Sequence, residues 1–105
     1  MALDFCIRNN HDEIIISVPM SYDSFYDIIE KSKSKSDSTI IGERLIHYFN
    51  DAEFYINELS ILKAELKNLV QDFINVEKTR EVIYLLIQLC DIASHLNKTI
   101  SVFAD

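Results

Sequence analysis

The feature that most constrains this chain is a long segment, residues 76–97, in which apolar side chains cover most of a helical surface. Asn75 precedes it and predicts an N-cap, because its side chain can accept a hydrogen bond from a free N–H of the first turn. Only one narrow polar stripe remains along the segment. A helix this apolar has to be covered on most sides, so we expect it to be the central element of the core. Its apolar set is Val82, Ile83, Leu85, Leu86, Leu89, Cys90, Ile92, Ala93 and Leu96.

Two runs of alternating apolar and polar residues open the chain, residues 3–8 and 13–18. Alternation places the apolar side chains of a strand on one face. The residues between the runs, 9–12, are Asn, Asn, His and Asp, which favour a tight turn. The pattern predicts a β-hairpin that ends at Pro19. The short β-branched segment 99–103 predicts a third strand beside the hairpin.

Three further helices are expected between the hairpin and the C-terminal helix. The first begins after Ser21, whose hydroxyl can cap it, and ends about ten residues later. The second covers about residues 39–50 and the third about residues 51–73. Residues 32–38 contain no apolar side chain and predict a flexible loop. The inward face expected for the first helix is Tyr22, Phe25, Ile28 and Ile29.

Apolar residues spaced by seven mark the third of these helices, for which Asp51 is the expected N-cap. Such a seam suits a long helix packed in a globular domain. It also suits a coiled-coil homodimer through residues 51–73. The seam residues are Ala52, Leu59, Leu66 and Phe73.

The order of these elements predicts an α+β fold. An N-terminal β-hairpin and a C-terminal strand would form a small antiparallel sheet, packed against about four α-helices. A chain of 105 residues is long enough for one core, so residues 1–105 are expected to form a single domain. One glycine and one proline argue against a loop-rich β-barrel and against low-complexity disorder.

Charge narrows the classes of partner. Seventeen acidic residues against ten basic ones give a net charge of −7. Nucleic-acid phosphates and anionic lipids repel such a surface, so we expect neither direct nucleic-acid binding nor membrane binding. A basic protein is the natural partner. The N-terminus has no signal-peptide pattern, which predicts a cytoplasmic protein, and Cys6 and Cys90 are expected to be free buried thiols.

Sequence motifs of catalysis are missing. The chain has no glycine-rich phosphate loop and no GxSxG, HExxH or CxxC motif. We therefore expect that the protein is not an enzyme and has neither a catalytic residue nor a cofactor. His47 stands four residues from both Glu43 and Asp51, and His95 four residues from Asp91. These pairs could converge on a metal if their helices were neighbours. Solvated i, i+4 pairs are the interpretation we adopt, and no metal site is predicted.

Tyrosine and carboxylate clusters are the better candidates for a site. Interfaces favour tyrosine, and acidic rims steer basic partners at high association rates. The polar stripe of the C-terminal helix carries one cluster, the start of the third helix another, and the first helix a third. In that order the candidates are Glu77, Glu81, Tyr84, Gln88 and Asp91; Asp51, Glu53, Tyr55 and Glu58; and Tyr22, Asp23, Tyr26, Asp27 and Glu30.

In character the chain resembles the immunity proteins of bacterial contact-dependent growth inhibition, a toxin/immunity system. Residues 16–26 (ISVPMSYDSFY) and 53–59 (EFYINEL) are in the style of such sequences. The resemblance implies a tight 1:1 complex with a cognate toxin domain, which is often a basic nuclease, with an RNase favoured here. The immunity protein would cover the active site of the toxin with its acidic surface. The alternative is a regulatory or adaptor module.

Overall fold

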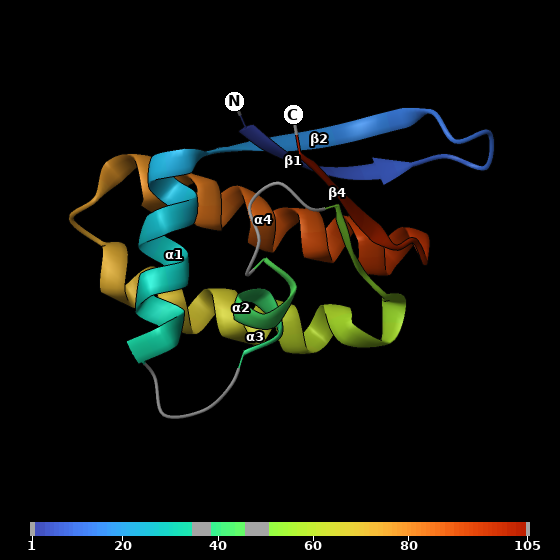
Figure 1. The fold of residues 1–105 in the computed structure, drawn as a ribbon. Coiled ribbons are helices and arrows are strands. Elements are labelled where there is room, and N and C mark those ends of the chain that lie inside the picture. The colour runs from blue at the N-terminus through green and yellow to red at the C-terminus, as the bar shows by residue number, and fades with distance from the viewer. Residues whose placement is uncertain (1, 35–38, 46–50, 105) are drawn as a thin grey trace.

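Four strands form one antiparallel sheet in the computed structural model, which describes residues 2–34, 39–45 and 51–104. The strands are β1 (Ala2–Arg8), β2 (Ile14–Ser21), β3 (Ala52–Phe54) and β4 (Ile100–Ala104), in the order β2-β1-β4-β3. The helices lie on one side of this sheet (Figure 1). The predicted α+β class, with its hairpin and C-terminal strand, is confirmed.

The hairpin turn uses the predicted chemistry. The Asn9 side chain accepts hydrogen bonds from the backbone N–H groups of His11 and Glu13, at 2.8 and 3.0 Å, and Asp12 has a positive φ of 64°. Pro19 does not end the strand as expected, because it lies within β2 opposite Asp4. An edge strand tolerates proline, since one side of its backbone needs no donor.

Three longer helices and a short one pack under the sheet: α1 (Tyr22–Ser34), α2 (Ile40–Arg44), α3 (Leu59–Val70) and α4 (Glu77–Leu96). The Ser21 hydroxyl accepts a hydrogen bond from the backbone N–H of Ser24, as expected of a cap. The expected cap of α4 was wrong by one residue: the N-cap is Val76, which makes no side-chain cap bond. Asn97 ends α4 in the left-handed conformation, with φ 58°.

The prediction of one helix over residues 51–73 was wrong. The segment contains β3, a 3-10 turn at Ile56–Glu58, the helix α3 and a second 3-10 turn at Gln71–Phe73. Ala52 therefore lies on a strand, and the line of heptads is broken. Asp51 caps no helix; its carboxylate accepts the backbone N–H of Ala104 at 3.1 Å. The coiled-coil homodimer through residues 51–73 loses its basis with the helix.

Pairing in the sheet explains why residues 52–54 form a strand and not part of a helix. Strand β4 has β1 on one side and needs a partner on the other, which β3 supplies. Phe54 is fully buried there, with its ring 6.5 Å from that of Phe5. Pairing and burial in the sheet outweigh a helical preference over three residues, because propensity is a weak local term.

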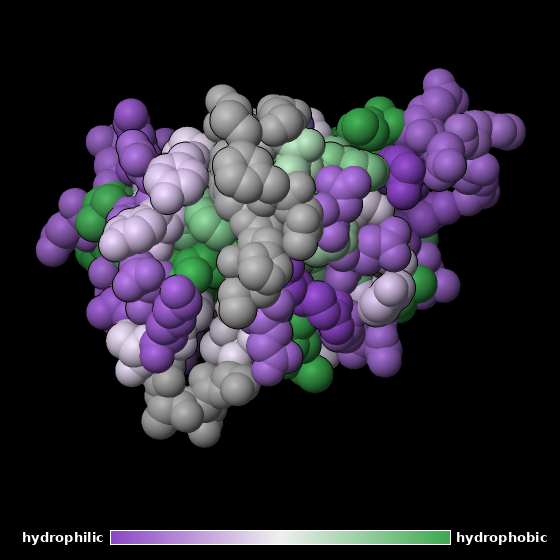
Figure 2. Space-filling view, in the orientation of Figure 1, coloured by the Kyte–Doolittle hydropathy of each residue, from purple (hydrophilic) through white to green (hydrophobic). Residues whose placement is uncertain are grey.

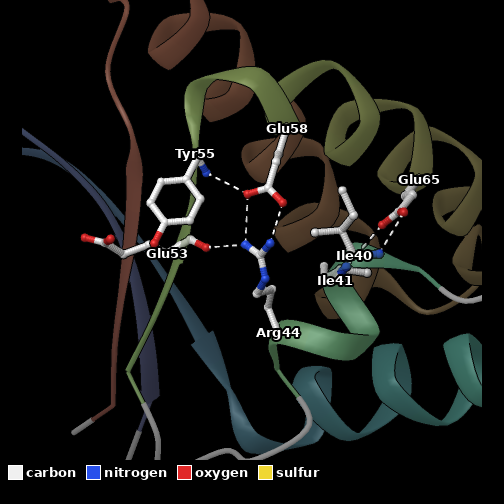
Figure 3. Close-up of polar contacts among 7 residues, drawn as sticks. All are labelled: Ile40, Ile41, Arg44, Glu53, Tyr55, Glu58 and Glu65. Carbon is white, nitrogen blue, oxygen red and sulfur yellow. Dashed lines mark hydrogen bonds and ion pairs between the residues drawn. The ribbon is translucent and has the colours of Figure 1, made fainter.

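The expected helix at residues 39–50 is seen as α2, and residues 46–50 lie outside the described part of the chain. Of the loop expected at 32–38, the first three residues belong to α1 and the rest lie outside the described part. Thr39 caps α2 by accepting the backbone N–H of Gly42 at 3.0 Å. The Glu65 carboxylate accepts the N–H groups of Ile40 and Ile41 at 2.8 and 3.1 Å, which fixes α2 to α3 (Figure 3).

One hydrophobic core joins the inner face of the sheet to all four helices. Six residues of α4 face it: Thr79, Ile83, Leu86, Leu89, Cys90 and Ala93.

The expectation that α4 is covered on most sides was wrong. Leu85, Ile92 and Leu96 are 46%, 38% and 43% exposed, because the sheet and the other helices cover only one side of α4. Cys6 and Cys90 are buried and free, as predicted. Within the described ranges, no helix has the length and apolarity needed to cross a membrane.

Candidate functional site

A hollow of about 420 Å³ lies where β2, α1 and α4 meet. Its walls carry both apolar and polar groups, so it can accept an amphipathic partner group. This hollow joins the edge of the sheet to the acidic stripe predicted on the C-terminal helix. Its lining residues are Pro19, Ser21, Ser24, Lys78, Glu81, Val82 and Leu85.

A buried joint holds α1 against α4 beside this hollow. The Thr79 hydroxyl lies 2.9 Å from a carboxylate oxygen of Asp27, to which it donates, and 3.2 Å from the Ser24 hydroxyl. Thr79 and Ser24 are almost fully buried. Asp27, chosen from the sequence as a partner-binding residue, therefore has an internal structural role. The joint also fixes the relative position of the α1 and α4 clusters.

The outer ridge of α4 carries the predicted stripe. Glu77, Glu81, Tyr84 and Gln88 are all exposed. Their side chains make no hydrogen bond or ion pair within the described ranges. Asp91 differs, because its carboxylate is 2.5 Å from the Lys63 ammonium of α3. The structure thus leaves two carboxylates, a phenol and an amide available along one rigid helix.

The exposed side of α1 presents two tyrosines. Tyr22 and Tyr26 are each 53% exposed, and their rings are 6.5 Å apart. Tyr22 was expected to point inward and does not, whereas Phe25 beside it is buried. Asp23 is exposed in the first turn, and Glu30 forms an i, i+3 ion pair with Lys33 at 3.7 Å.

In the third predicted cluster, Asp51, Glu53, Tyr55 and Glu58, one residue has a structural role and the others lie on the surface (Figure 3). Glu58 accepts hydrogen bonds from both terminal nitrogens of the Arg44 guanidinium, and from the backbone N–H of Tyr55 at 3.0 Å. Arg44 also donates to the Glu53 backbone carbonyl at 2.6 Å. The Arg44 guanidinium, together with the Tyr55 N–H, lowers the pKa of Glu58, and the same bond raises the pKa of Arg44. Glu58 therefore has a structural role: it links α2 to the segment after β3, and we call it the fastener of these two segments.

The rest of that cluster lies along a second hollow of about 370 Å³. This hollow sits beside β3, at the opposite edge of the sheet from β2. The Arg8 guanidinium stands 5.1 Å from the centre of the Phe103 ring at its border. The lining residues are Asp51, Ala52, Glu53, Tyr55, Ser101, Val102 and Phe103.

The predicted residues therefore do not form one surface. Of those on α1 and α4, Glu81 lines the β2-edge hollow and Asp27 bonds Thr79 beside it, whereas Asp51, Glu53 and Tyr55 lie at the β3 edge. The apolar part of the β2-edge surface was not predicted, because the apolar pattern of the helix assigned Leu85 to the core. The i, i+7, i+11 spacing of Leu85, Ile92 and Leu96 was the available signal, since it places all three on one flank. Figure 2, in which α2 and β3 are toward the viewer, shows a different apolar patch, beside the hydrophilic tip of the hairpin.

Metal-binding geometry is not found in the described ranges, where no group of three or more His, Cys, Asp or Glu side chains could hold an ion. His95 is exposed on α4, and His47 lies outside those ranges.

The chain matches no protein-family model, and comparisons with curated proteins and with solved structures give no match either. A function is therefore proposed from the charges, hollows and exposed side chains of the chain itself.

Proposed function

We propose that the protein is an immunity protein: it binds and neutralises a basic toxin domain by covering that domain's active site. The observation that carries the proposal is the exposed ridge of α4. Glu77, Glu81 and Tyr84 stand on it without an internal partner in the described ranges, beside a partly apolar hollow. Unpaired carboxylates on a rigid element suit a cationic partner.

The ridge is rigid before binding. The inner face of α4 is buried over most of its length, with Ile83 and Leu89 almost fully enclosed. The bonds from Thr79 to Ser24 and Asp27 fix the N-terminal half of the helix. A surface that is already ordered loses little conformational entropy on association, which favours a tight complex.

A nuclease is the toxin class that fits this surface best. Its cleft is built to attract phosphates, so carboxylates use the same electrostatic attraction as the substrate. An RNase-type toxin bound 1:1 in the cytoplasm is the specific form of the proposal. The protein then needs neither a catalytic residue nor a cofactor, and it contacts neither nucleic acid nor membrane directly.

The decisive experiment is to express the tagged chain in its native host and identify what co-purifies in stoichiometric amount. A basic nuclease domain, toxic alone and harmless when co-expressed with this chain, supports the proposal. A stoichiometric partner without toxicity would favour the regulatory or adaptor module instead.

Association kinetics then test the surface. The double variant Glu77→Lys/Glu81→Lys should slow association at least about tenfold at low salt and weaken its salt dependence, because acidic steering is reversed. Glu53→Lys, at the opposite edge of the sheet, is the matched control and should leave the association rate nearly unchanged. The reverse result would move the binding surface to the β3 edge.

A further inference from the structure

Exposed apolar residues of α4 lie in one line along the helix. Leu85, Ile92 and Leu96 lie within about 40° of one another around the axis, at 100° per residue. Val82, half-buried, continues the strip toward the N-terminus of α4. Leu85 lines the hollow together with Pro19, so the strip runs on the β2 side of α4. We call Val82, Leu85, Ile92 and Leu96 the α4 flank.

The hairpin carries two further exposed apolar residues. Helix α4 packs against β2, and the Lys98 ammonium bonds the Asn10 side chain, which holds the end of α4 against the hairpin tip. Ile14 and Ile15, at the start of β2, are 56% and 49% exposed. Exposed apolar side chains that gather in one region mark an interaction surface, whereas single ones are ordinary.

The form of the β2 edge decides how a partner can bind here. An open edge strand would ordinarily accept another strand. In β2, however, Pro19 lacks an N–H, and the register with β1 shifts opposite Ile7 and Arg8, which makes Ile15 a bulge. Proline and a bulge both disrupt strand pairing. Between these two irregularities only residues 16–18 remain regular, which is too short for a stable added strand.

Charge decides the chemistry of the partner. Glu77 and Glu81 stand on the solvent side of the α4 flank, and Glu13 precedes the exposed Ile14. Lys78 is the basic residue that lines the hollow. Acids along the solvent side of an apolar strip complement a segment whose apolar stripe is bordered by basic residues. A second copy of this chain, with its net charge of −7, is a poorer match.

We propose that the α4 flank binds a basic amphipathic α-helix of the partner protein. From Leu85 to Leu96 the flank covers about three helical turns, or roughly 16 Å. The partner helix therefore presents apolar residues at i, i+4, i+7 and i+11, with Lys or Arg beside them facing Glu77 and Glu81. This inference rests on the proposed function, since it names the segment of the basic partner that the acidic surface receives.

The probe for this proposal is a designed 16-residue helical peptide with leucine at i, i+4, i+7 and i+11 and lysine at the flanking positions. Binding to the full chain is followed by fluorescence anisotropy, and the contact surface is mapped by amide chemical shifts. Leu85→Asp/Ile92→Asp should weaken binding at least tenfold. The matched control is Ile61→Asp on α3, where the isoleucine is 52% exposed, and it should bind as the parent does.

Each outcome has one meaning. Shifts along the α4 flank, with binding lost in Leu85→Asp/Ile92→Asp alone, support the proposal. Peptide binding that survives this variant but fails in Glu77→Lys/Glu81→Lys overturns the apolar flank and leaves the proposed function standing. Binding equally strong for a peptide of the same composition with scrambled spacing overturns the helical mode. A concentration-dependent dimer in light scattering that Leu85→Asp/Ile92→Asp abolishes shows that a second copy occupies the flank.

Discussion

Replacing Glu58 by glutamine tests whether this acid is a structural fastener and not a partner-binding residue. The change removes the negative charge and one of the two oxygens that face Arg44. The side chains of Arg44 and Glu58 are 33% and 15% exposed, so the pair lies between a surface ion pair and a buried one. Exposed pairs contribute roughly 0.2–1 kcal/mol, and hydrogen bonds to charged groups roughly 1.5–3 kcal/mol. We therefore expect Glu58→Gln to lower the free energy of unfolding by about 1.5 kcal/mol.

For a chain of this length that loss corresponds to a fall in Tm of roughly 6–10 °C. Urea and thermal unfolding followed by circular dichroism measure it. Glu53→Gln is the matched control, because its side chain is exposed and only its backbone carbonyl contacts Arg44; its stability should stay within about 0.5 kcal/mol of the parent. Equal losses in the two variants, or no loss in Glu58→Gln, would refute the assignment of Glu58 as the fastener.

The same pair predicts a dependence on pH. Arg44 and the Tyr55 N–H lower the pKa of Glu58 in the folded state. The pair therefore stabilises the fold fully above the unfolded pKa of glutamate, roughly 4.3. Its contribution is lost as pH falls through the lower folded value. Glu58→Gln should accordingly show a flatter loss of stability below about pH 4 than the parent.

Three further predictions concern the core and its close contacts. Gly42→Ala should lower the free energy of unfolding, because the new Cβ would lie 2.8 Å from the capping oxygen of Thr39 and 3.3 Å from Cβ of Ser32. This crowding opposes the helix preference of alanine over glycine, which is about 1 kcal/mol. Chemical denaturation shows whether the variant is less stable than the parent. Burial, with the Asp91 charge beside it, raises the pKa of Cys90 to about 12, so mass spectrometry should find iodoacetamide labelling of Cys90 at pH 8 only after unfolding. This thiol favours the folded state below the unfolded cysteine pKa, roughly 8.5, and its contribution declines as pH rises above that value. Phe54→Ala should cost about 3–5 kcal/mol in unfolding free energy, whereas Tyr55→Ala should cost much less.

Local patterns in the sequence predicted the elements that depend on neighbouring residues. Alternation predicted the hairpin, β-branched residues predicted β4, turn chemistry predicted the bend at Asn9, and helical periodicity predicted α4 with most of its buried face. Each of these signals comes from residues a few positions apart, which share one face of a strand or helix. The exposed stripe Glu77, Glu81 and Tyr84 followed from the same periodicity.

Elements that depend on distant residues were not predictable in this way. Residues 52–54 carry no strong strand signal, and they become β3 because β4, some fifty residues further on, offers an unpaired edge and a place for Phe54 beside Phe5. From the sequence Glu58 looks like any other surface acid, and only the folded structure places Arg44 of α2 next to it.

What the sequence by itself determined about this protein is its class, its acidic surface and the side of each element that is apolar. Only the tertiary structure decided where the core ends. The sheet covers one side of α4 and leaves Leu85, Ile92 and Leu96 exposed beside Glu77 and Glu81. Hydrophobicity is a property of each residue, whereas burial depends on which elements pack against it, and that packing is set by contacts across the whole chain.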